Sequence, residues 1–404
     1  MPPAADPGRG FATPSRGGGA IAALLKARRL AWLGAHIGIW FARRLGRPLR
    51  LGRLVIVARY KDVRAVLARD LDFRIAPINA AHFDAIGYHF ILGMDRSDEL
   101  RRERQVLYAA LASVDFAQHK AKTRLEIAAR LERVACGSID IIEDFARPVA
   151  AATAQHLFGI APVEQARFMD AARAIFGHCF LNPANDPTVA VRAQAAAVQL
   201  TTWFDSEIAR RRAQNTLGSD MMGQLLAAGA TDDLARRTLG GMLVGSIDTT
   251  ASVVAKVMIV FMGDSALRAR VSADKHDEVR LYGWCQEALR CWAHVPILGR
   301  QAALSTTISG TDVPAGAKVI LWTQAAMLDP EGFPNPNAMR PDRPGDSYLH
   351  LGAGLHPCAG RTLNAWQIPM LVGALLEHNP RSIGTVRWAG PFPAHVPLRL
   401  GPAA

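Results

Sequence analysis

The apolar segment 232–263, DDLARRTLGGMLVGSIDTTASVVAKVMIVFMG, constrains the fold more than any other part of the sequence. Thr231 and the two aspartates that follow it form a favourable N-terminal cap, and no proline interrupts the segment. The pattern therefore predicts one uninterrupted helix, about 45 Å long. Because nearly all of its faces are apolar, this helix must lie inside a large domain or span a membrane. Asp248 and Lys256 lie in the apolar part and argue against a membrane span.

The remaining patterns predict a mainly α protein with a small β portion. Residues 75–93 lack periodicity and are expected to form a long loop, and long loops in compact domains are often functional. Alternating and helical spacings elsewhere predict a strand and helix over 53–70, helices over 97–228 with breaks near 181–189 and 215–220, a helix near 275–293, and short strands over 299–324.

Composition predicts one domain with a tail. Residues 1–20 are rich in proline, glycine and alanine, which predicts a disordered N-terminal tail. Half of the 404 residues are hydrophobic, which is enough for a sizeable core. No linker-like stretch divides the rest, so we expect residues 21–404 to form a single domain.

The net charge of +12 raises the question of an acidic partner. No DNA-reading or RNA-reading module is recognisable, and the arginines are dispersed, so nucleic acid is not an expected partner. The excess is therefore either an ordinary solvated basic surface or a docking face for an acidic electron carrier.

Cysteine usage and the lack of a recognisable secretory signal lead us to expect a cytoplasmic protein. The five cysteines, at 136, 179, 285, 291 and 358, form no two-residue-gap pair, so we expect neither a disulfide framework nor a zinc motif. No secretory signal is evident. Segment 31–50 has too few apolar residues for a transmembrane anchor; it packs on the domain or lies on a membrane surface.

The stretch LGAGLHPCAG, residues 351–360, surrounds Cys358 with glycines, a histidine and a proline. Glycines allow a bulky partner to approach the backbone closely. A helical pattern starts three residues after Cys358, so its sulfur is expected near a helix N-terminus, where the dipole favours a thiolate. The stretch therefore predicts a thiolate presented to a large group; the alternative is a turn with a buried thiol.

Two further patterns combine polar groups with apolar surroundings. Glu287 and Arg290 are spaced to pair on one helix face, and Arg343 from a proline-rich coil is a candidate third partner; a solvated surface pair is the alternative. Asp248 and Thr249 interrupt the apolar helix. The Thr249 hydroxyl can bond the Gly245 carbonyl and loosen the helix locally, which indicates a proton relay or, alternatively, satisfied core groups.

Together, in this order, the three patterns resemble the cytochrome P450 monooxygenases. The family signature is Phe-Gly-x-Gly-x-His/Arg-x-Cys-x-Gly-x-x-Leu-Ala, in which Leu351 and Asn364 here replace the phenylalanine and the last alanine. The matching residues are Gly352, Gly354, His356, Cys358, Gly360 and Leu363. The family's Glu-x-x-Arg, its coil arginine and its central acid–threonine pair match Glu287, Arg290, Arg343, Asp248 and Thr249. The resemblance extends from about residue 51 to the C-terminus.

The resemblance implies a haem-thiolate enzyme that holds haem b. Cys358 would bind the haem iron, and a thiolate on that iron favours O–O cleavage. Asp248 and Thr249 would handle protons during the activation of O2. Arg300 and His356 would bind the haem propionates, together with either Arg101 or Arg104, depending on the register of the preceding helix.

The resemblance also implies a substrate and redox partners. The expected reaction inserts one oxygen atom into a hydrophobic small molecule, by hydroxylation or epoxidation. Electrons would come from an acidic ferredoxin-type donor and its NAD(P)H reductase, docking near Arg101, Arg102 and Arg361. The residues expected to line the substrate pocket are Phe83, Ile86, Phe90, Leu243, Gly245 and Ile297.

Three alternatives stay open at this point. A peroxide-driven peroxygenase of the same fold is disfavoured by the pair Asp248 and Thr249. A non-catalytic haem-binding sensor predicts a six-coordinate iron that ignores apolar ligands. A haem-free helical binding module predicts a colourless protein.

Overall fold

The computed structural model describes residues 44, 46–133, 137–161, 163–182 and 184–401. The expected tail over 1–20, most of segment 31–50 and Cys136 lie outside these residues. The assignment of 21–404 to one domain stays a prediction. Helices dominate the described part, and strands are short, as the sequence predicts.

The helices are α2 (Tyr60–Ala68), α3 (Ala76–Asp84), α4 (Asp98–Ser113), α5 (Phe116–Glu132), α6 (Arg147–Phe158), α7 (Gln165–Leu181), α8 (Pro187–Ala213), α9 (Met221–Ala227), α10 (Asp232–Val244), α11 (Asp248–Met262), α12 (Ser265–Ala273), α13 (Glu278–Cys291), α14 (Thr323–Ala326) and α15 (Arg361–Glu377), with single turns η1 (Ile91–Gly93), η2 (Ile141–Ala146) and η3 (Gly345–Ser347). The strands are β1 (Leu49–Leu51), β2 (Leu54–Val57), β3 (Phe73–Arg74), β4 (Ser138–Asp140), β5 (Leu298–Ala302), β6 (Thr306–Ile308), β7 (Thr311–Val313), β8 (Lys318–Leu321), β9 (Pro380–Ile383), β10 (Arg387–Ala389), β11 (Phe392–His395) and β12 (Pro397–Leu400).

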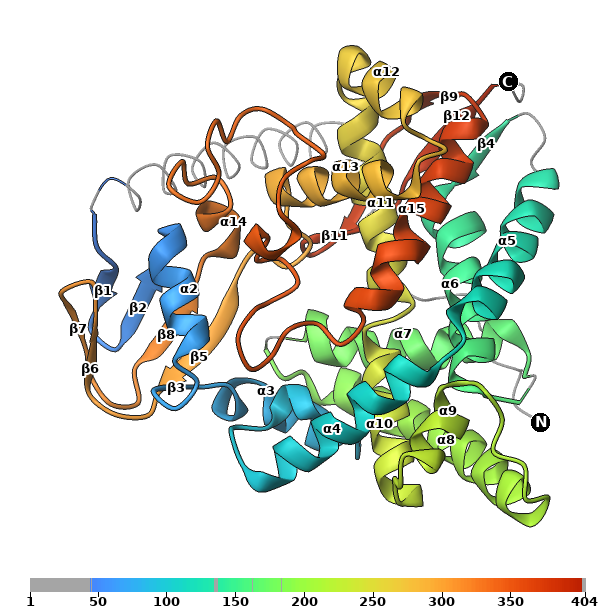
Figure 1. The fold of residues 1–404 in the computed structure, drawn as a ribbon, viewed down its shortest axis with the longest axis horizontal. Coiled ribbons are helices and arrows are strands. Elements are labelled where there is room, and N and C mark those ends of the chain that lie inside the picture. Colours follow the sequence, from blue (N-terminus) through green and yellow to red (C-terminus); the bar gives the residue numbers. More distant parts are fainter. Residues whose placement is uncertain (1–43, 45, 134–136, 162, 183, 402–404) are drawn as a thin grey trace, which may run out of the picture.

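A mixed five-stranded sheet forms one side of the molecule, with helices on the other (Figure 1). Its order is β1-β2-β8-β5-β3, so β8 and β5 from the C-terminal half lie between strands from the N-terminal part of the chain. β2 and β8 are parallel, with Val55 opposite Val319, and the other neighbours are antiparallel. β4, β12 and β9 form a second, antiparallel sheet, and β6–β7 and β10–β11 are separate hairpins.

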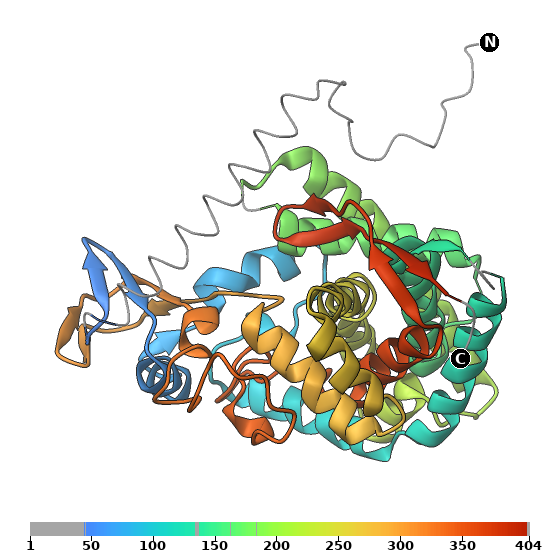
Figure 2. The same ribbon diagram turned by 90° about the horizontal axis from the view of Figure 1, so that it is seen from above.

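The central helix of the sequence is the centre of the helical layer. In Figure 2 the yellow α10–α11 segment is seen nearly end-on, with other helices around it. α11 packs against α13 and α15, and their apolar side chains form one buried cluster that includes Val254, Leu289 and Leu371. By length and composition the segment Asp232–Met262 could cross a bilayer, but 78% of its apolar window is buried inside the protein.

The prediction of one uninterrupted helix over 232–263 is wrong, because the helix breaks between α10 and α11. The backbone N–H groups of Gly245 and Ser246 bond to Met242 and Leu243, one residue short of α-helical spacing. The hydroxyls of Thr249 and Thr250 donate to the carbonyls of Gly245 and Ser246, which replaces backbone bonds in the ladder. Local side-chain competition therefore opens the helix beside its acid–threonine pair.

The prediction of a loop over 75–93 is also wrong in part. Residues 76–84 form α3, with Pro77 in the first turn, where a proline costs no backbone bond. α3 has almost no amphipathic pattern, because it lies on the surface of a cavity rather than on one face of a core. Periodicity therefore gave no sign of this helix.

Candidate active site

A cavity of about 410 Å³ lies between α11 and the loop that carries Cys358. α3, α7 and α10 contribute apolar side chains to its wall, and β5 closes one side. Among the residues expected to contact substrate, Phe83, Phe90, Gly245 and Ile297 line the cavity. Ile86 and Leu243 are buried in the neighbouring core cluster instead and do not line it.

The loop before α15 aims Cys358 into this cavity. Gly352 and Gly354 have φ of +68° and +71°, which an L side chain rarely adopts. A Cβ on Gly354 would also clash with the Leu67 carbonyl of α2, so the loop packs directly against that helix. The Cys358 N–H donates to Leu351 O at 2.7 Å, and Cys358 O accepts from Arg361 N at the start of α15. The thiol therefore lies at a helix N-terminus, as expected, and is accessible from the cavity.

Burial and nearby polar groups act in opposite directions on the Cys358 sulfur. Burial raises the pKa of the Cys358 thiol, although the Gly360 N–H and the Arg361 charge act in the opposite direction.

Glu287, Arg290 and Arg343 come together in the core behind the cavity. Glu287 and Arg290 are fully buried and joined by bonds of 2.7 and 3.0 Å, and Arg343 Nε reaches Glu287 Oε2 at 3.2 Å. Tyr348 donates to Glu287 Oε1 at 2.9 Å. Arg290 also donates to Met327 O. Because Tyr348 directly precedes the cysteine loop, this network ties α13 to the segment that positions Cys358.

Thr249 and Asp248 occupy different positions relative to the cavity. Thr249 lines it, with its hydroxyl donating to Gly245 O. Asp248 is only 8% exposed and does not line it. Its Oδ1 lies 3.1 Å from Arg147 Nε of α6 and 3.1 Å from Arg173 Nε of α7, whereas Oδ2 is buried without a partner. Two guanidinium groups therefore hold the Asp248 carboxylate away from the cavity surface, whereas the Thr249 hydroxyl borders the cavity.

Positive charge without acidic partners gathers at one end of the cavity. Arg300 is 6% exposed, and its guanidinium donates to Gly299 O; burial lowers its pKa to about 10. Burial, followed by the charges of Arg300 and Arg104, lowers the pKa of His356 to about 4, and Arg104 Nη1 is buried without a partner among the described residues. Within the described ranges no carboxylate pairs with Arg300, Arg104 or Arg361, so this end is suited to an anionic ligand group.

The family model described as Cytochrome P450 matches residues 50–379. The chain belongs to the cytochrome P450 family. This P450 is 27% identical over 248 residues to Cytochrome P450 109 of Bacillus spizizenii, covering 59% of this chain and 60% of that protein. It is 26% identical to the Mycinamicin IV hydroxylase/epoxidase of Micromonospora griseorubida, covering 80% of this chain and 82% of that protein. The crystal structure of CalO2 shares the fold, with a TM-score of 0.79, 20% identity, and coverage of 92% and 96%.

Haem b is the cofactor of this family, and the described residues of this P450 fit it. The Cys358 thiol, beside the N-terminus of α15, can supply a thiolate ligand for haem iron. The buried arginines at one end of the cavity lack carboxylates, and the two haem carboxylates would supply them. The glycine backbone near Cys358 leaves room for a flat ring, because no side chain projects from Gly352 or Gly360, both of which line the cavity.

The register of α4 separates the two arginine alternatives. The Arg101 side chain is 74% exposed and pairs with Asp98 at 2.9 Å on the outer face. Arg104, one turn later, is half-buried and stacks over Tyr108, which lines the cavity. Arg104 is therefore the candidate for a propionate, whereas Arg101 lies outside the cavity. Glu103 faces inward and pairs with Arg237 of α10 at 2.7 Å.

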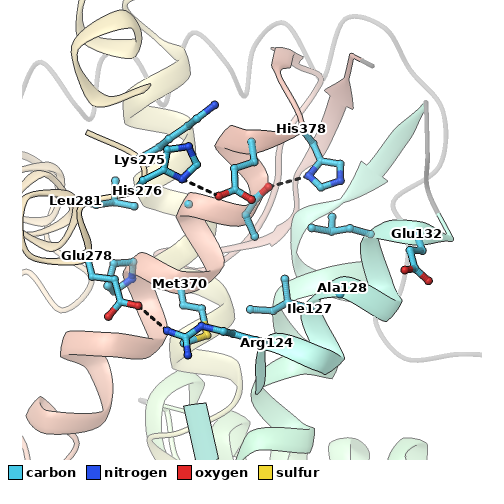
Figure 3. Close-up of a pocket in the computed structure, with 15 residues that line it drawn as sticks. Arg124, Ile127, Ala128, Glu132, Lys275, His276, Glu278, Leu281, Met370 and His378 are labelled. Atoms are coloured by element: carbon cyan, nitrogen blue, oxygen red, sulfur yellow. Dashed lines mark hydrogen bonds and ion pairs between the residues drawn. The ribbon is translucent and has the colours of Figure 1, made fainter. Parts of the chain in front are cut away.

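A second hollow of about 600 Å³ lies between α5, α15 and the start of α13 (Figure 3). Four of its charged or titratable side chains form two pairs: Arg124 with Glu278 at 2.9 Å, and His276 with Glu377 at 3.2 Å. His378 bonds to the Ala374 carbonyl in the last turn of α15. No cysteine is among the described residues that line this hollow, which distinguishes it from the central cavity.

Sequence reasoning missed the partners that come from other helices. Arg147 and Arg173 contact Asp248 but lie 101 and 75 residues before it in the sequence. No local sequence pattern links residues so far apart. Tyr348 completes the Glu287 network and could have been suspected, because it lies in the coil next to Arg343. Glu103 and Arg237 pair through tertiary packing of α4 and α10, which the sequence does not reveal.

Proposed function

We propose that this P450 is a haem-thiolate monooxygenase that inserts one oxygen atom of O2 into a hydrophobic small molecule. The observation that carries the proposal is that Cys358 and Thr249 line the same mostly apolar cavity. The name of the Micromonospora relative, a hydroxylase/epoxidase, supports the reaction type. The match spans about 60% of the length of the Bacillus relative, so the activity rests on the site rather than on that name alone.

Cys358, Arg300, His356 and Arg104 would hold the haem. Cys358 is the iron ligand, and the other three bind the propionates at the cationic end of the cavity. When bound, haem supplies the activation of O2 and the oxygen transfer to substrate. Gly352, Gly354 and Gly360 shape the backbone that carries the cysteine.

Thr249 and Asp248 manage protons in this proposal. The Thr249 hydroxyl donates to Gly245 O, so its oxygen lone pairs are available to accept a bond from the cavity. Asp248 Oδ2 has no partner, while Oδ1 is held by Arg147 and Arg173. Asp248 Oδ2 would first take up a proton from solvent and then pass it toward the Thr249 hydroxyl, which restores the carboxylate, and the two guanidinium groups would keep the acid oriented.

The substrate class follows from the wall of the cavity. Phe83, Phe90, Ile297 and Gly245 are apolar and line the same cavity as Thr249. Such a lining favours an apolar molecule and gives few polar contacts that would fix its orientation.

Electron delivery would come from an acidic ferredoxin-type donor with its NAD(P)H reductase, in the cytoplasm. Arg101 and Arg102 are exposed on α4, and Arg361 begins the helix that follows Cys358. Charge attraction at this face would steer the donor. Arg101→Glu and Arg102→Glu should weaken donor affinity at low salt, whereas Arg50→Glu on β1 should not; equal affinities would contradict the docking face.

The reduced carbonyl complex tests the enzyme class. A thiolate-bound iron gives a strongly red-shifted Soret band, and the purified protein should show it. Cys358→Ser should lose this band, whereas Cys291→Ser, also a free cysteine, should keep it. A colourless wild-type protein would favour the binding module. A six-coordinate iron indifferent to apolar ligands would favour the sensor, and turnover supported by peroxide but not by O2 with reductant would favour the peroxygenase.

A further inference from the structure

Two adjacent glycines on α10 lie directly beneath an aromatic segment of the cavity wall. A Cβ on Gly240 would stand 2.6 Å from Tyr88 Cδ1, and a Cβ on Gly241 would stand 2.8 Å from Phe90 Cδ1 and closer still to Cγ. Real Cβ contacts are never so short, so both rings rest on bare helix backbone. Any side chain at these positions must move the ring above it.

The segment that carries both rings is fixed at two successive residues, Tyr88 and His89. The Tyr88 hydroxyl donates to Ala197 O of α8 at 3.0 Å and lies 3.3 Å from Thr201 Oγ1. The carbonyl of His89 accepts from Arg237 of α10. Arg237 is itself held by Glu103 at 2.7 Å and by Asp233 at 2.7 Å. The segment is therefore a rigid wall rather than a mobile flap.

The two glycines differ in what their aromatic partner faces. Phe90 lines the cavity beside Phe83, with ring centroids 5.9 Å apart, whereas Tyr88 is buried and does not line it. α10 backs the Phe90 ring, and the cavity lies in front of it. A methyl group on Gly241 therefore pushes the ring toward the cavity, whereas one on Gly240 disturbs only buried packing.

We propose that Gly241 is a specificity-determining residue: by letting Phe90 rest on the α10 backbone, it sets the largest molecule that the cavity accepts. A side chain at position 241 should weaken the binding of bulky apolar molecules. Small molecules should bind as before, because they do not reach the displaced Phe90 ring. This inference rests on the proposed function, since the cavity is taken as the substrate site.

Azole ligands of increasing bulk test the inference on the haem-loaded protein. Imidazole, 4-phenylimidazole and clotrimazole share one iron-binding nitrogen and differ in the volume that they carry, and their dissociation constants can be read from the Soret shift. Gly241→Ala should weaken clotrimazole at least tenfold and leave imidazole within about twofold. Phe90→Leu should act in the opposite direction, and the double variant Gly241→Ala with Phe90→Leu should restore clotrimazole binding to the wild-type level or better.

Gly240→Ala is the matched control, because it adds the same methyl group one residue away. It should lower thermal stability but leave the ratio of clotrimazole to imidazole affinity unchanged. An unchanged ratio in Gly241→Ala, or equal changes in both glycine variants, would overturn the inference. If Gly241→Ala does not fold, an unaltered ratio in Phe90→Leu overturns it as well. Failure of the proposed function is separate: the wild-type protein would then show no azole-dependent Soret shift at all.

Discussion

Asp248 of α11 and Arg173 of α7 form an ion pair of 3.1 Å across the helix break. Arg147 of α6 contacts the same carboxylate oxygen, and Glu143 contacts both arginines at 2.7 and 3.1 Å. Three elements distant in sequence thus meet at one acid. α7 also contributes Phe180 to the cavity wall, and Asp248 is the residue before Thr249. The ion pair therefore links the cavity wall on α7 to the acid–threonine pair of α11.

Removing Arg173 should impair proton handling more than folding. Arg173→Leu leaves Asp248 with Arg147 alone, so the carboxylate loses its fixed orientation. We expect product formed per electron pair consumed to fall several-fold, with a loss of about 1 kcal/mol in the free energy of unfolding, since the Arg173 side chain is partly exposed. Arg167→Leu on the same helix is the control. An unaltered product ratio would show that the pair is only structural.

Thr249 and Thr250 offer a matched pair of substitutions. Both hydroxyls donate to a carbonyl four residues back, but Thr249 is the more exposed to the cavity, whereas Thr250 is 3% exposed. Thr249→Val should reduce product per oxygen consumed by roughly tenfold, since it removes the hydroxyl oxygen that accepts a bond from the cavity, and positioned acid–base groups contribute about 10²–10⁴-fold to rate. Thr250→Val should alter stability with little effect on that ratio. The measurement is oxygen uptake, product and released peroxide in the same reaction; equal ratios in the two variants would contradict a role for the Thr249 hydroxyl.

Strong local signals made much of the fold predictable. Thr231 caps α10 by accepting from Leu234 N at 3.1 Å, as its position before two aspartates indicates. The break at Gly245–Ile247 was not predicted in full, because a bond from the Thr249 hydroxyl to a carbonyl competes with the helical ladder only once the helix is packed. α3 was missed because its side chains face a cavity and carry no helical periodicity.

Some residues of the site could be predicted from the sequence, whereas others could not. Cys358, Glu287 and Arg290 lie in short motifs whose spacing fixes their geometry, so the sequence was sufficient to find them. The partners of Asp248 were not predictable, since Arg147 and Arg173 reach it only through the packing of α6 and α7 on α11. Sequence spacing reveals neighbours on one helix, and tertiary contacts between helices need the fold.

The buried Glu287 network should be costly to break. Glu287→Gln removes the charge that Arg290 and Arg343 share, and it leaves two guanidinium groups near the core without a carboxylate. Breaking one partner of a buried pair typically costs about 3–5 kcal/mol. We expect low haem content and an unfolding midpoint well below that of the wild type. Tyr348→Phe should cost about 1 kcal/mol, since it removes one hydrogen bond and keeps the charges. Equal stability of wild type and Glu287→Gln, by chemical denaturation, would contradict this account.

Lys256 should lower stability at neutral pH. Its side chain is 2% exposed, its Nζ donates to Ala293 O at 3.1 Å, and it lies 5.5 Å from the ring centroid of Trp292. No carboxylate within the described part of the chain pairs with it. Burial lowers the pKa of Lys256 from 10.5 to about 8, so the folded protein releases this proton before the unfolded chain does. Its contribution to stability is therefore most favourable above pH 10.5 and is lost as the pH falls toward 8.

Lys256→Met tests this sign directly. The variant should be more stable than the wild type by roughly 1–3 kcal/mol at pH 7, because it removes an unpaired buried charge. The difference should shrink as the pH rises from 8 toward 10.5, since the wild-type lysine then becomes neutral in the fold. Urea unfolding at a series of pH values measures it, with Lys61→Met, an exposed lysine, as the control. A difference that stays constant over this pH range would show that packing, and not the charge of Lys256, determines the effect.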